Sequence, residues 1–142
     1  MKVRHLMTPK PITISPEETV AVASRTLTHY NIGMLPVCNA DGALQGVLTD
    51  RDIVTRCLAG EKDPLKTSVR DIMTQQVRTA DPNMDAAVAA HLMGSQQIRR
   101  LPVLENGKLC GLLSLGDLAT NDETTIDAAD ALSDITSNIS FR

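Results

Sequence analysis

The stretch VRHLMT at residues 3–8 returns as VRDIMT at residues 69–74 in this chain of 142 residues. Two further stretches recur in the same order: LPV at 35–37 returns at 101–103, and GVLTDRD at 46–52 returns as GLLSLGD at 111–117. The two copies are offset by 66 residues up to Leu-Pro-Val and by 65 after it, because the turn at Asp41-Gly42 is one residue longer than its counterpart at Asn106-Gly107. The chain is therefore a tandem duplication. Because a unit this short cannot bury its apolar face alone, we expect the two copies to share one core and to enclose a cleft with two similar pockets.

Each copy has the pattern of a strand, a helix, two strands and a second helix, preceded by a short helical turn. In the first copy the predicted elements are a strand at 11–14, a helix at 19–30, strands at 35–38 and 44–48, and a helix at 50–58. In the second copy they are a strand at 77–80, a helix at 85–96, strands at 100–104 and 108–113, and a helix at 115–121. The residues expected on the inner helix faces are Val20, Ala23, Leu27 and Tyr30 in the first copy, and Ala86, Ala89 and Met93 in the second.

These patterns divide the chain into a first repeat at 1–60, a linker at 61–67, a second repeat at 68–121 and an acidic tail at 122–142. The tail carries five of the 17 acidic residues, and its apolar residues recur every three or four positions, as on one face of a helix. The residues of that face are Ile126, Ala129, Leu132, Ile135 and Ile139. We therefore expect a C-terminal amphipathic helix that has no counterpart in the first repeat.

Composition excludes several classes of protein. One Phe, one Tyr and no Trp leave an aliphatic core and no stacking platforms for single-stranded nucleic acid. The net charge of −3 and the lack of a helix-turn-helix signal make nucleic acid an unlikely partner and disfavour a small DNA-binding regulator. No apolar run has the length of a signal peptide or a membrane span, so no membrane partner and a cytoplasmic location are expected.

The sequence predicts neither an enzyme nor a metal site. Cys38, Cys57 and Cys110 are odd in number and far apart, which favours small buried thiols in a reducing compartment over disulfides or zinc. The three histidines share no ligand spacing, and no nucleophile–base arrangement is recognisable.

The most informative polar residues lie where a strand passes into a helix in each copy. Thr49 and Asp52, like Ser114 and Asp117, have the spacing of a capping box, and this alone explains both motifs. The same geometry serves a ligand, because free N–H groups at a helix start attract phosphate and an ionised Asp accepts hydrogen bonds from ribose hydroxyls. Both interpretations stay open on the residues alone.

Taken together, Met-Thr, Leu-Pro-Val and the Gly-containing strand ending in Thr/Ser-x-x-Asp, in two copies, resemble a tandem cystathionine-β-synthase (CBS) domain pair. The resemblance covers residues 3 to about 121. The chain is also similar in length to small bacterial proteins in which the pair stands alone. It implies an α+β fold of two β-α-β-β-α repeats related by an approximate two-fold axis, with the Leu-Pro-Val strands central. It also implies a regulatory module that binds an adenosyl ligand, is expected to form a homodimer, and acts on an unknown protein target.

Two nucleotide sites follow from the resemblance by position, each combining one repeat's helix start with residues of the other repeat. The first comprises Thr49, Asp50, Arg51, Asp52, Thr74, Val77, Thr79, Arg99 and Arg100. The second and weaker comprises Thr8, Ile12, Thr13, Gly33, Met34, Ser114, Gly116 and Asp117. Three arginines in the first site suit phosphate oxygens, whereas the second lacks a cation, so phosphate binding there is in doubt.

The predicted function is the sensing of AMP, ADP, ATP or another adenosyl ligand such as S-adenosylmethionine, with no tightly bound cofactor. The alternative is a ligand-free structural or partner-docking protein, active for example in a stress response, in which the motifs only cap helices.

Overall fold

The computed structural model describes residues 1–137 and divides the chain into two compact units. The first-repeat unit is Ile12–Val77, and the second-repeat unit combines Met1–Pro11 with the chain from Arg78 onward. The segment that leads into each repeat, which contains residues 3–8 in the first and 69–74 in the second, therefore belongs to the unit of the other repeat. We call these two stretches the lead-in segments. Val3 N–H donates to Met84 O, and Val69 N–H donates to Glu18 O, so the two lead-ins are held in equivalent ways.

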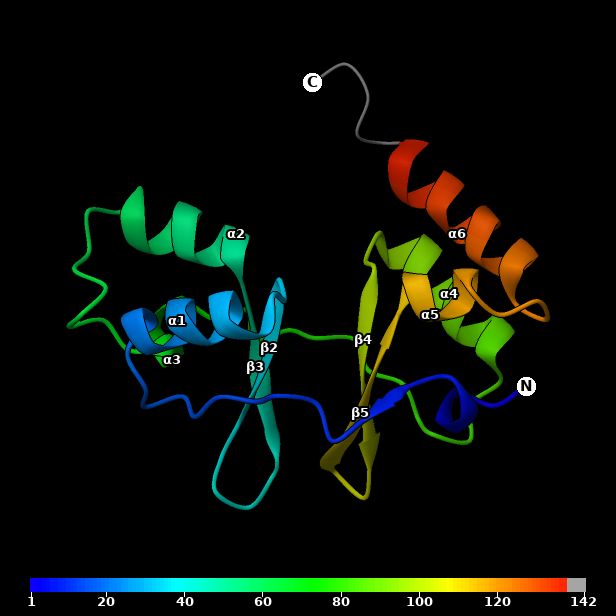
Figure 1. The fold of residues 1–142 in the computed structure, drawn as a ribbon, viewed down its shortest axis with the longest axis horizontal. Helices are drawn as coiled ribbons and strands as arrows, with labels where there is room; N and C mark the ends of the chain where they lie inside the picture. The colour runs from blue at the N-terminus through cyan, green and yellow to red at the C-terminus, as the bar shows by residue number, and fades with distance from the viewer. Residues whose placement is uncertain (138–142) are drawn as a thin grey trace. The chain divides into compact units, whose positions relative to one another are not determined.

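The first-repeat unit is a helix-covered hairpin (Figure 1). Its elements are α1 (Val20–Tyr30), β2 (Met34–Cys38), β3 (Leu44–Thr49), α2 (Asp50–Asp52), η2 (Ile53–Leu58) and α3 (Val69–Ile72). Helix α1 begins where Thr19 accepts a hydrogen bond from Val22 N–H, and it ends at Asn31 in a left-handed conformation. Strand β2 pairs antiparallel with β3 and also forms a parallel bridge between Val37 and Ile14, so the Leu-Pro-Val strand is central as predicted.

The second-repeat unit repeats this order and adds a helix. Its elements are η1 (Val3–His5), β1 (Thr8–Pro9), α4 (Ala86–Gln96), β4 (Arg100–Glu105), β5 (Lys108–Ser114), α5 (Leu115–Ala119) and α6 (Thr125–Ser137). The sheet has the order β1-β5-β4, and Ala80 bridges Val103 on the other side of β4. The register matches too: Met34 pairs with Thr49, and Arg100 with Ser114.

Each unit encloses its own hydrophobic cluster. Leu35 and Leu48 are fully buried in the first, together with Val69 and Ile72 from the second repeat's lead-in. Leu101 and Leu113 are fully buried in the second, together with Val3 from the first repeat's lead-in. In each unit the lead-in segment of the other repeat completes the cluster. That the two copies share one core stays a prediction.

Several predicted elements differ in detail. The strands expected at 11–14 and 77–80 are single parallel bridges at Ile14 and Ala80, while β1 pairs with β5 without having been predicted. Tyr30, expected on the inner face of α1, is 50% exposed, whereas the other predicted inner residues of α1 and α4 are buried. The predicted helix at 50–58 is present, but Ala59 N–H donates to Val54 O, five residues back, so η2 is π-helical.

Helix α6 packs against α4 and α5 (Figure 1). The C-terminal helix is confirmed, and Ile135 is buried as predicted. Ile126, Ala129 and Leu132 of the predicted face are exposed, and Ala128 and Ala131 are buried instead. Helix α6 approaches α4 closely at Gly94, where an added Cβ atom would lie 3.3 Å from Ala131 Cα. Ile139, also predicted on that face, lies outside the described residues. Among residues 1–137, no helix is long and apolar enough to cross a membrane.

Candidate functional site

The start of α2 is a complete capping box. Thr49 Oγ1 accepts a hydrogen bond from Asp52 N–H at 3.0 Å, and Asp52 Oδ2 accepts one from Thr49 N–H at 3.0 Å. Strand β3 delivers Thr49 to this position in an extended conformation, and α2 runs on into η2. The arrangement fixes the Asp52 carboxylate at the helix start, where the helix dipole favours a negative charge.

Asp52 has further polar neighbours in the same unit. It is only 7% exposed, and its Oδ1 lies 3.4 Å from Thr74 Oγ1 and 3.7 Å from Arg56 Nε. A carboxylate with two oxygens retains acceptor capacity beyond these contacts. The side chain is therefore a fixed, almost buried anion with hydroxyl and guanidinium groups around it.

Thr74 reaches Asp52 because the backbone comes unusually close to β3. Thr74 and Val47 exchange two backbone hydrogen bonds, each 2.9 Å long. A Cβ atom on Gly46 would lie 2.5 Å from Thr74 O, so only glycine admits this approach. The repeated Gly at the third position of β3 is thus part of the Asp52 site.

The second-repeat unit builds the same box with fewer partners. Ser114 Oγ accepts a hydrogen bond from Asp117 N–H at 3.0 Å, and Asp117 Oδ2 accepts one from Ser114 N–H at 2.8 Å. Within the described part of the chain, Asp117 makes no contact equivalent to those of Asp52 with Thr74 and Arg56. Thr8, the counterpart of Thr74, is exposed and paired with Leu112.

The residues predicted for the two nucleotide sites are distributed over both units. Those of the first site that lie in the first-repeat unit are Thr49, Asp50, Arg51, Asp52, Thr74 and Val77, and those in the second-repeat unit are Thr79, Arg99 and Arg100. For the second site, the first-repeat unit holds Ile12, Thr13, Gly33 and Met34, and the second-repeat unit holds Thr8, Ser114, Gly116 and Asp117. Within the first-repeat unit, hydrogen bonds join Thr49, Asp52 and Thr74 of the first set, and a separate one joins Arg51 to Asp50.

Two of the arginines predicted to bind phosphate, Arg51 on α2 and Arg99 just before β4, have different surroundings. Arg51 is exposed, and its backbone N–H donates to Asp50 Oδ1. Arg99 O accepts a hydrogen bond from Leu115 N–H at 2.7 Å, which fixes the Arg99 backbone beside the second helix start. Gly33 O accepts in the same way from Asp50 N–H at 3.1 Å, so the residues that precede each Leu-Pro-Val strand border the helix start of their own unit.

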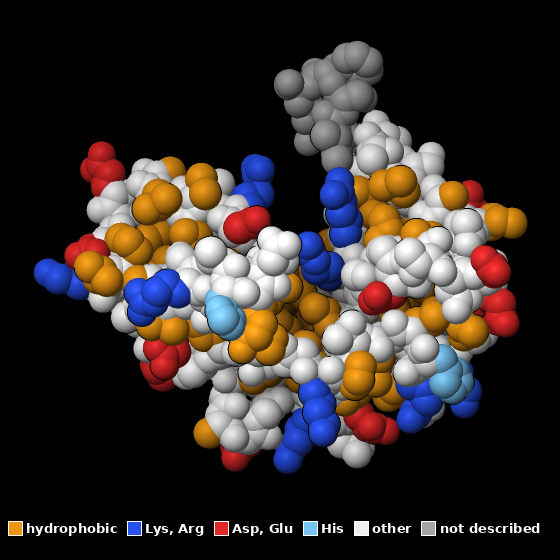
Figure 2. All heavy atoms as spheres, in the orientation of Figure 1, with side chains coloured by type: hydrophobic (Ala, Val, Ile, Leu, Met, Phe, Trp, Pro, Cys, Tyr) orange, Lys and Arg blue, Asp and Glu red, His pale blue; other side chains and the backbone are white. Residues whose placement is uncertain are grey.

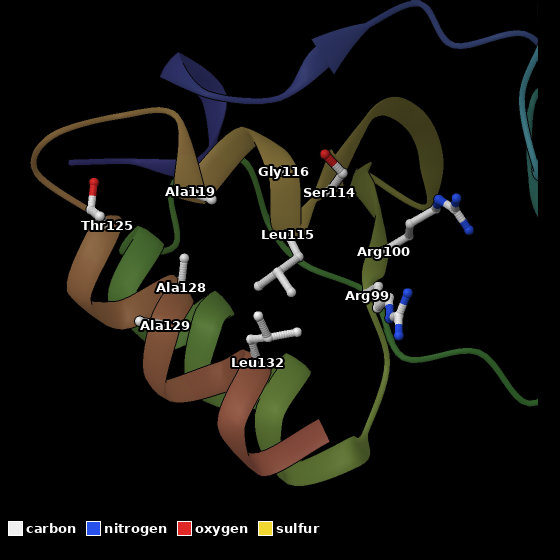
Figure 3. A pocket seen from close by; sticks show the side chains of 10 residues that line it. All are labelled: Arg99, Arg100, Ser114, Leu115, Gly116, Ala119, Thr125, Ala128, Ala129 and Leu132. Atoms are coloured by element: carbon white, nitrogen blue, oxygen red, sulfur yellow. The ribbon is translucent and has the colours of Figure 1, made fainter. Parts of the chain in front are cut away.

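A pocket of about 530 Å³ opens beside the second helix start (Figure 3). Its lining residues are Arg99, Arg100, Ser114, Leu115, Gly116, Ala119, Thr125, Ala128, Ala129 and Leu132. Leu115 and Leu132 point toward one another across it, whereas the Arg99 and Arg100 side chains extend away to one side (Figure 3). The pocket is therefore mainly an apolar groove between α5 and α6, with its cations at the rim.

The other groups that could bind a metal or act as nucleophiles are the cysteines, histidines and acidic residues. Among residues 1–137, no group of three or more His, Cys, Asp or Glu side chains could hold a metal ion. Cys38 and Cys57 are buried as predicted, and Cys110 is half-buried. Burial raises the pKa of the Cys38 thiol, which makes it a poor nucleophile at neutral pH. Basic and acidic side chains are interspersed on the face drawn in Figure 2.

Sequence reasoning missed Arg56, which contacts Asp52 from one turn along the helix. The signal was available, since Asp52 and Arg56 are four residues apart and such a pair shares one helix face. The motif GVLTDRD at 46–52 contains Arg51, and the prediction therefore named that arginine.

Comparison with known proteins decides the family. The family model for the CBS domain matches twice, at residues 3–59 and 69–124. The chain belongs to the CBS domain family. Together the two matches cover both capping boxes and the repeated stretches at residues 3–8 and 69–74.

Relatives of similar length share this organisation. The CBS domain-containing protein YhcV of Bacillus subtilis is 38% identical over 133 residues, which is 94% of each chain. Hypoxic response protein 1 of Mycobacterium tuberculosis is 31% identical over 116 residues, 82% of this chain and 81% of that protein. A crystal structure of a hypoxic response protein I, with two coordinated zinc ions, gives a TM-score of 0.78 at 30% identity and covers 84% of this chain and 97% of that one.

A further solved structure contains ligands. The CBS domain pair of protein MJ0100, in complex with 5-methylthioadenosine and S-adenosyl-L-methionine, gives a TM-score of 0.75 at 27% identity. The match covers 84% of this chain and 97% of that one. Both ligands carry an adenosyl group.

Proposed function

We propose that this protein is a non-catalytic regulatory module that binds an adenosyl ligand, and that Asp52 holds the ribose of that ligand. The supporting observation is the almost buried Asp52 carboxylate, fixed by Thr49 and lying beside the Thr74 hydroxyl. An ionised carboxylate in this position accepts hydrogen bonds from vicinal hydroxyls. The adenosyl ligands of the MJ0100 CBS pair support the ligand class.

Within this class we infer that AMP, ADP or ATP binds at Thr49, Asp50, Arg51, Asp52, Thr74 and Val77. The ground is the electrostatics of the α2 start, where the helix dipole and Arg51 favour a phosphate group. Thr79, Arg99 and Arg100 lie in the other unit and stay predictions for this site. The weaker site at Thr8, Ile12, Thr13, Gly33, Met34, Ser114, Gly116 and Asp117 also stays a prediction.

Titration calorimetry of the full chain with AMP, ADP, ATP and S-adenosylmethionine tests the proposal, with ribose 5-phosphate as the control. We expect saturable heat from at least one adenosyl ligand and little from the control, which lacks the base. Flat traces for all adenosyl ligands at millimolar concentration would overturn it.

A second function has its own support. Both capping boxes are complete without a ligand, since each carboxylate and each hydroxyl already accepts a backbone N–H. A ligand-free structural or partner-docking protein needs no more than this. In that case Asp52→Ala lowers stability by up to about 1 kcal/mol and has no ligand to affect.

We further infer a homodimer in the cytoplasm, acting on a protein target of unknown identity. The Val20/Leu27 and Ala86/Met93 faces, on which a dimer was predicted, are buried inside their own units. The dimer is better supported by Val54 and Leu58, which lie one turn apart on η2 and are 56% and 55% exposed. Three free cysteines favour a reducing compartment. A monomer mass by light scattering at tens of micromolar would contradict the dimer.

A further inference from the structure

Arg56 connects the Asp52 site to the segment that leads out of the first-repeat unit. Its Nη1 donates to Ile72 O and Met73 O, each at 3.1 Å, while its Nε lies 3.7 Å from Asp52 Oδ1. Ile72 is the last residue of α3 and Met73 is its C-cap. One guanidinium therefore bridges the candidate ribose carboxylate and the carbonyl end of α3, where a cation is favourable.

The bridged segment continues directly into the candidate site. Met73 is followed by Thr74, whose hydroxyl lies 3.4 Å from Asp52 Oδ1 and whose backbone is paired with Val47. Past Thr74, the chain passes through Val77 into the second-repeat unit. A change in how Asp52 is held therefore acts on one of the two stretches by which the chain passes between the units.

Among residues 1–137, the second repeat has no such bridge. Asn121 stands 65 residues after Arg56, at the equivalent position, and its side chain accepts a hydrogen bond from Glu123 N–H in the connection to α6. The bridge is thus a property of the first-repeat unit, where Asp52 is buried, and not of the capping box as such.

We propose that Arg56 is a positioning residue of the ligand site, which ties the Asp52 carboxylate to residues 72–74. The proposal rests on the proposed function above and deepens it. Arg56 holds Asp52 in one orientation before the ligand arrives, so the ligand meets a preorganised acceptor. Because binding and anchoring share one carboxylate, a ligand at Asp52 strengthens the hold on residues 72–74, and the coupling is reciprocal.

The test compares Arg56→Gln, Arg56→Lys and the control Arg25→Gln, an exposed arginine on α1 of the same unit. The first readout is hydrogen exchange of the peptide 69–77 in the full chain without ligand. We expect exchange about three- to tenfold faster in Arg56→Gln, an intermediate rate in Arg56→Lys, and no change in the control.

The second readout is AMP affinity by calorimetry, together with the effect of AMP on the same exchange. Arg56→Gln should raise the Kd for AMP about three- to tenfold, which is moderate because the side chain is half exposed. AMP should slow exchange of 69–77 in the wild type and have less effect in Arg56→Gln, a coupling that a purely structural arginine would not produce.

The outcomes separate this inference from the function on which it rests. Equal exchange of 69–77 in the wild type and Arg56→Gln overturns the anchoring, and an unchanged Kd despite faster exchange overturns the positioning role. A wild type that binds no adenosyl ligand overturns the proposed function and the ligand half of this inference. The exchange of unliganded protein then still decides the anchoring half.

Discussion

The two repeats form the same backbone and differ in what surrounds it. Both end their second hairpin strand in a capping box with nearly equal distances. In the first-repeat unit the carboxylate of Asp52 is buried beside Thr74 and Arg56. In the second, the carboxylate of its counterpart Asp117 is half-buried, and within residues 1–137 its hydrogen bond stays inside the box. The difference shows that the box is a feature of the fold, while the setting of Asp52 needs residues outside it.

Helices α1 and α4 also differ, and here the second-repeat unit has the additional contacts. In the second-repeat unit α6 covers α4, and a Cβ atom on Gly94 would lie 2.9 Å from Asp134 Oδ2 and 3.3 Å from Ala131 Cα. The position 66 residues earlier on α1 is Thr28, which is exposed and donates to Ser24 O. The two units thus share one backbone arrangement. The first-repeat unit has the carboxylate with more polar contacts, and the second-repeat unit has the additional helix.

The equivalent backbones of the two repeats predict the largest loss of stability. Leu35 and Leu101 occupy the same place in the Leu-Pro-Val strands and are both fully buried. Leu35→Ala and Leu101→Ala should each lower the free energy of unfolding by about 2–5 kcal/mol, and by similar amounts. Urea denaturation measures both. A loss more than twice as large in one variant would mean that the two cores are not equivalent.

The close approach of the lead-in segments to β3 and β5 predicts that two equivalent glycine substitutions lower stability by different amounts. A Cβ atom at Gly46 meets the Thr74 carbonyl oxygen, while at Gly111 it meets the side chain of Met7. Backbone cannot yield as a flexible Met does, so Gly46→Ala should cost about 1–3 kcal/mol and Gly111→Ala clearly less. The same denaturation experiment checks this, and the reverse order would contradict the account of Thr74.

The additional helix predicts a contrast at Gly94 and Thr28. Gly94→Leu should expel α6 from α4 and cost roughly 1–3 kcal/mol, because the leucine side chain has no space there. Thr28→Leu, at the exposed equivalent position, should stay within about 0.5 kcal/mol of the wild type. Hydrogen exchange of 125–137 should rise in the first variant only. Protected exchange in Gly94→Leu would show that α6 does not depend on this contact.

Most of the fold could be predicted from the sequence, because its patterns are local. Thr19 and Asp85 marked two helix starts, and Asn106-Gly107 marked a hairpin. The exchange of lead-ins could not be predicted, since Val3 and Val69 look alike and nothing local says which repeat each one packs on. The burial of Asp52 was not predicted for a similar reason, because Thr74 reaches it from a segment 22 residues further along the chain.

The smallest expected change in ligand affinity is that of a substitution at Arg100, at the rim of the groove in Figure 3. Arg100 is exposed, and a solvated cation contributes little to binding a phosphate. Arg100→Ala should weaken ATP binding about two- to fivefold at low salt, weaken adenosine binding less, and lose its effect at high salt. A loss that is equal for ATP and adenosine would remove Arg100 from the phosphate site.

The comparison of the two carboxylates is tested most directly by the AMP affinity of Asp52→Ala and Asp117→Ala, measured side by side with the wild type by calorimetry. If Asp52 holds the ribose, Asp52→Ala should weaken binding about ten- to a hundredfold, equivalent to roughly 1.5–3 kcal/mol for hydrogen bonds to a charged acceptor. Asp117→Ala should cost clearly less, with a similar loss of capping stability in both variants. Equal affinities for all three proteins, or a larger loss in Asp117→Ala, would contradict the assignment of the ligand to Asp52.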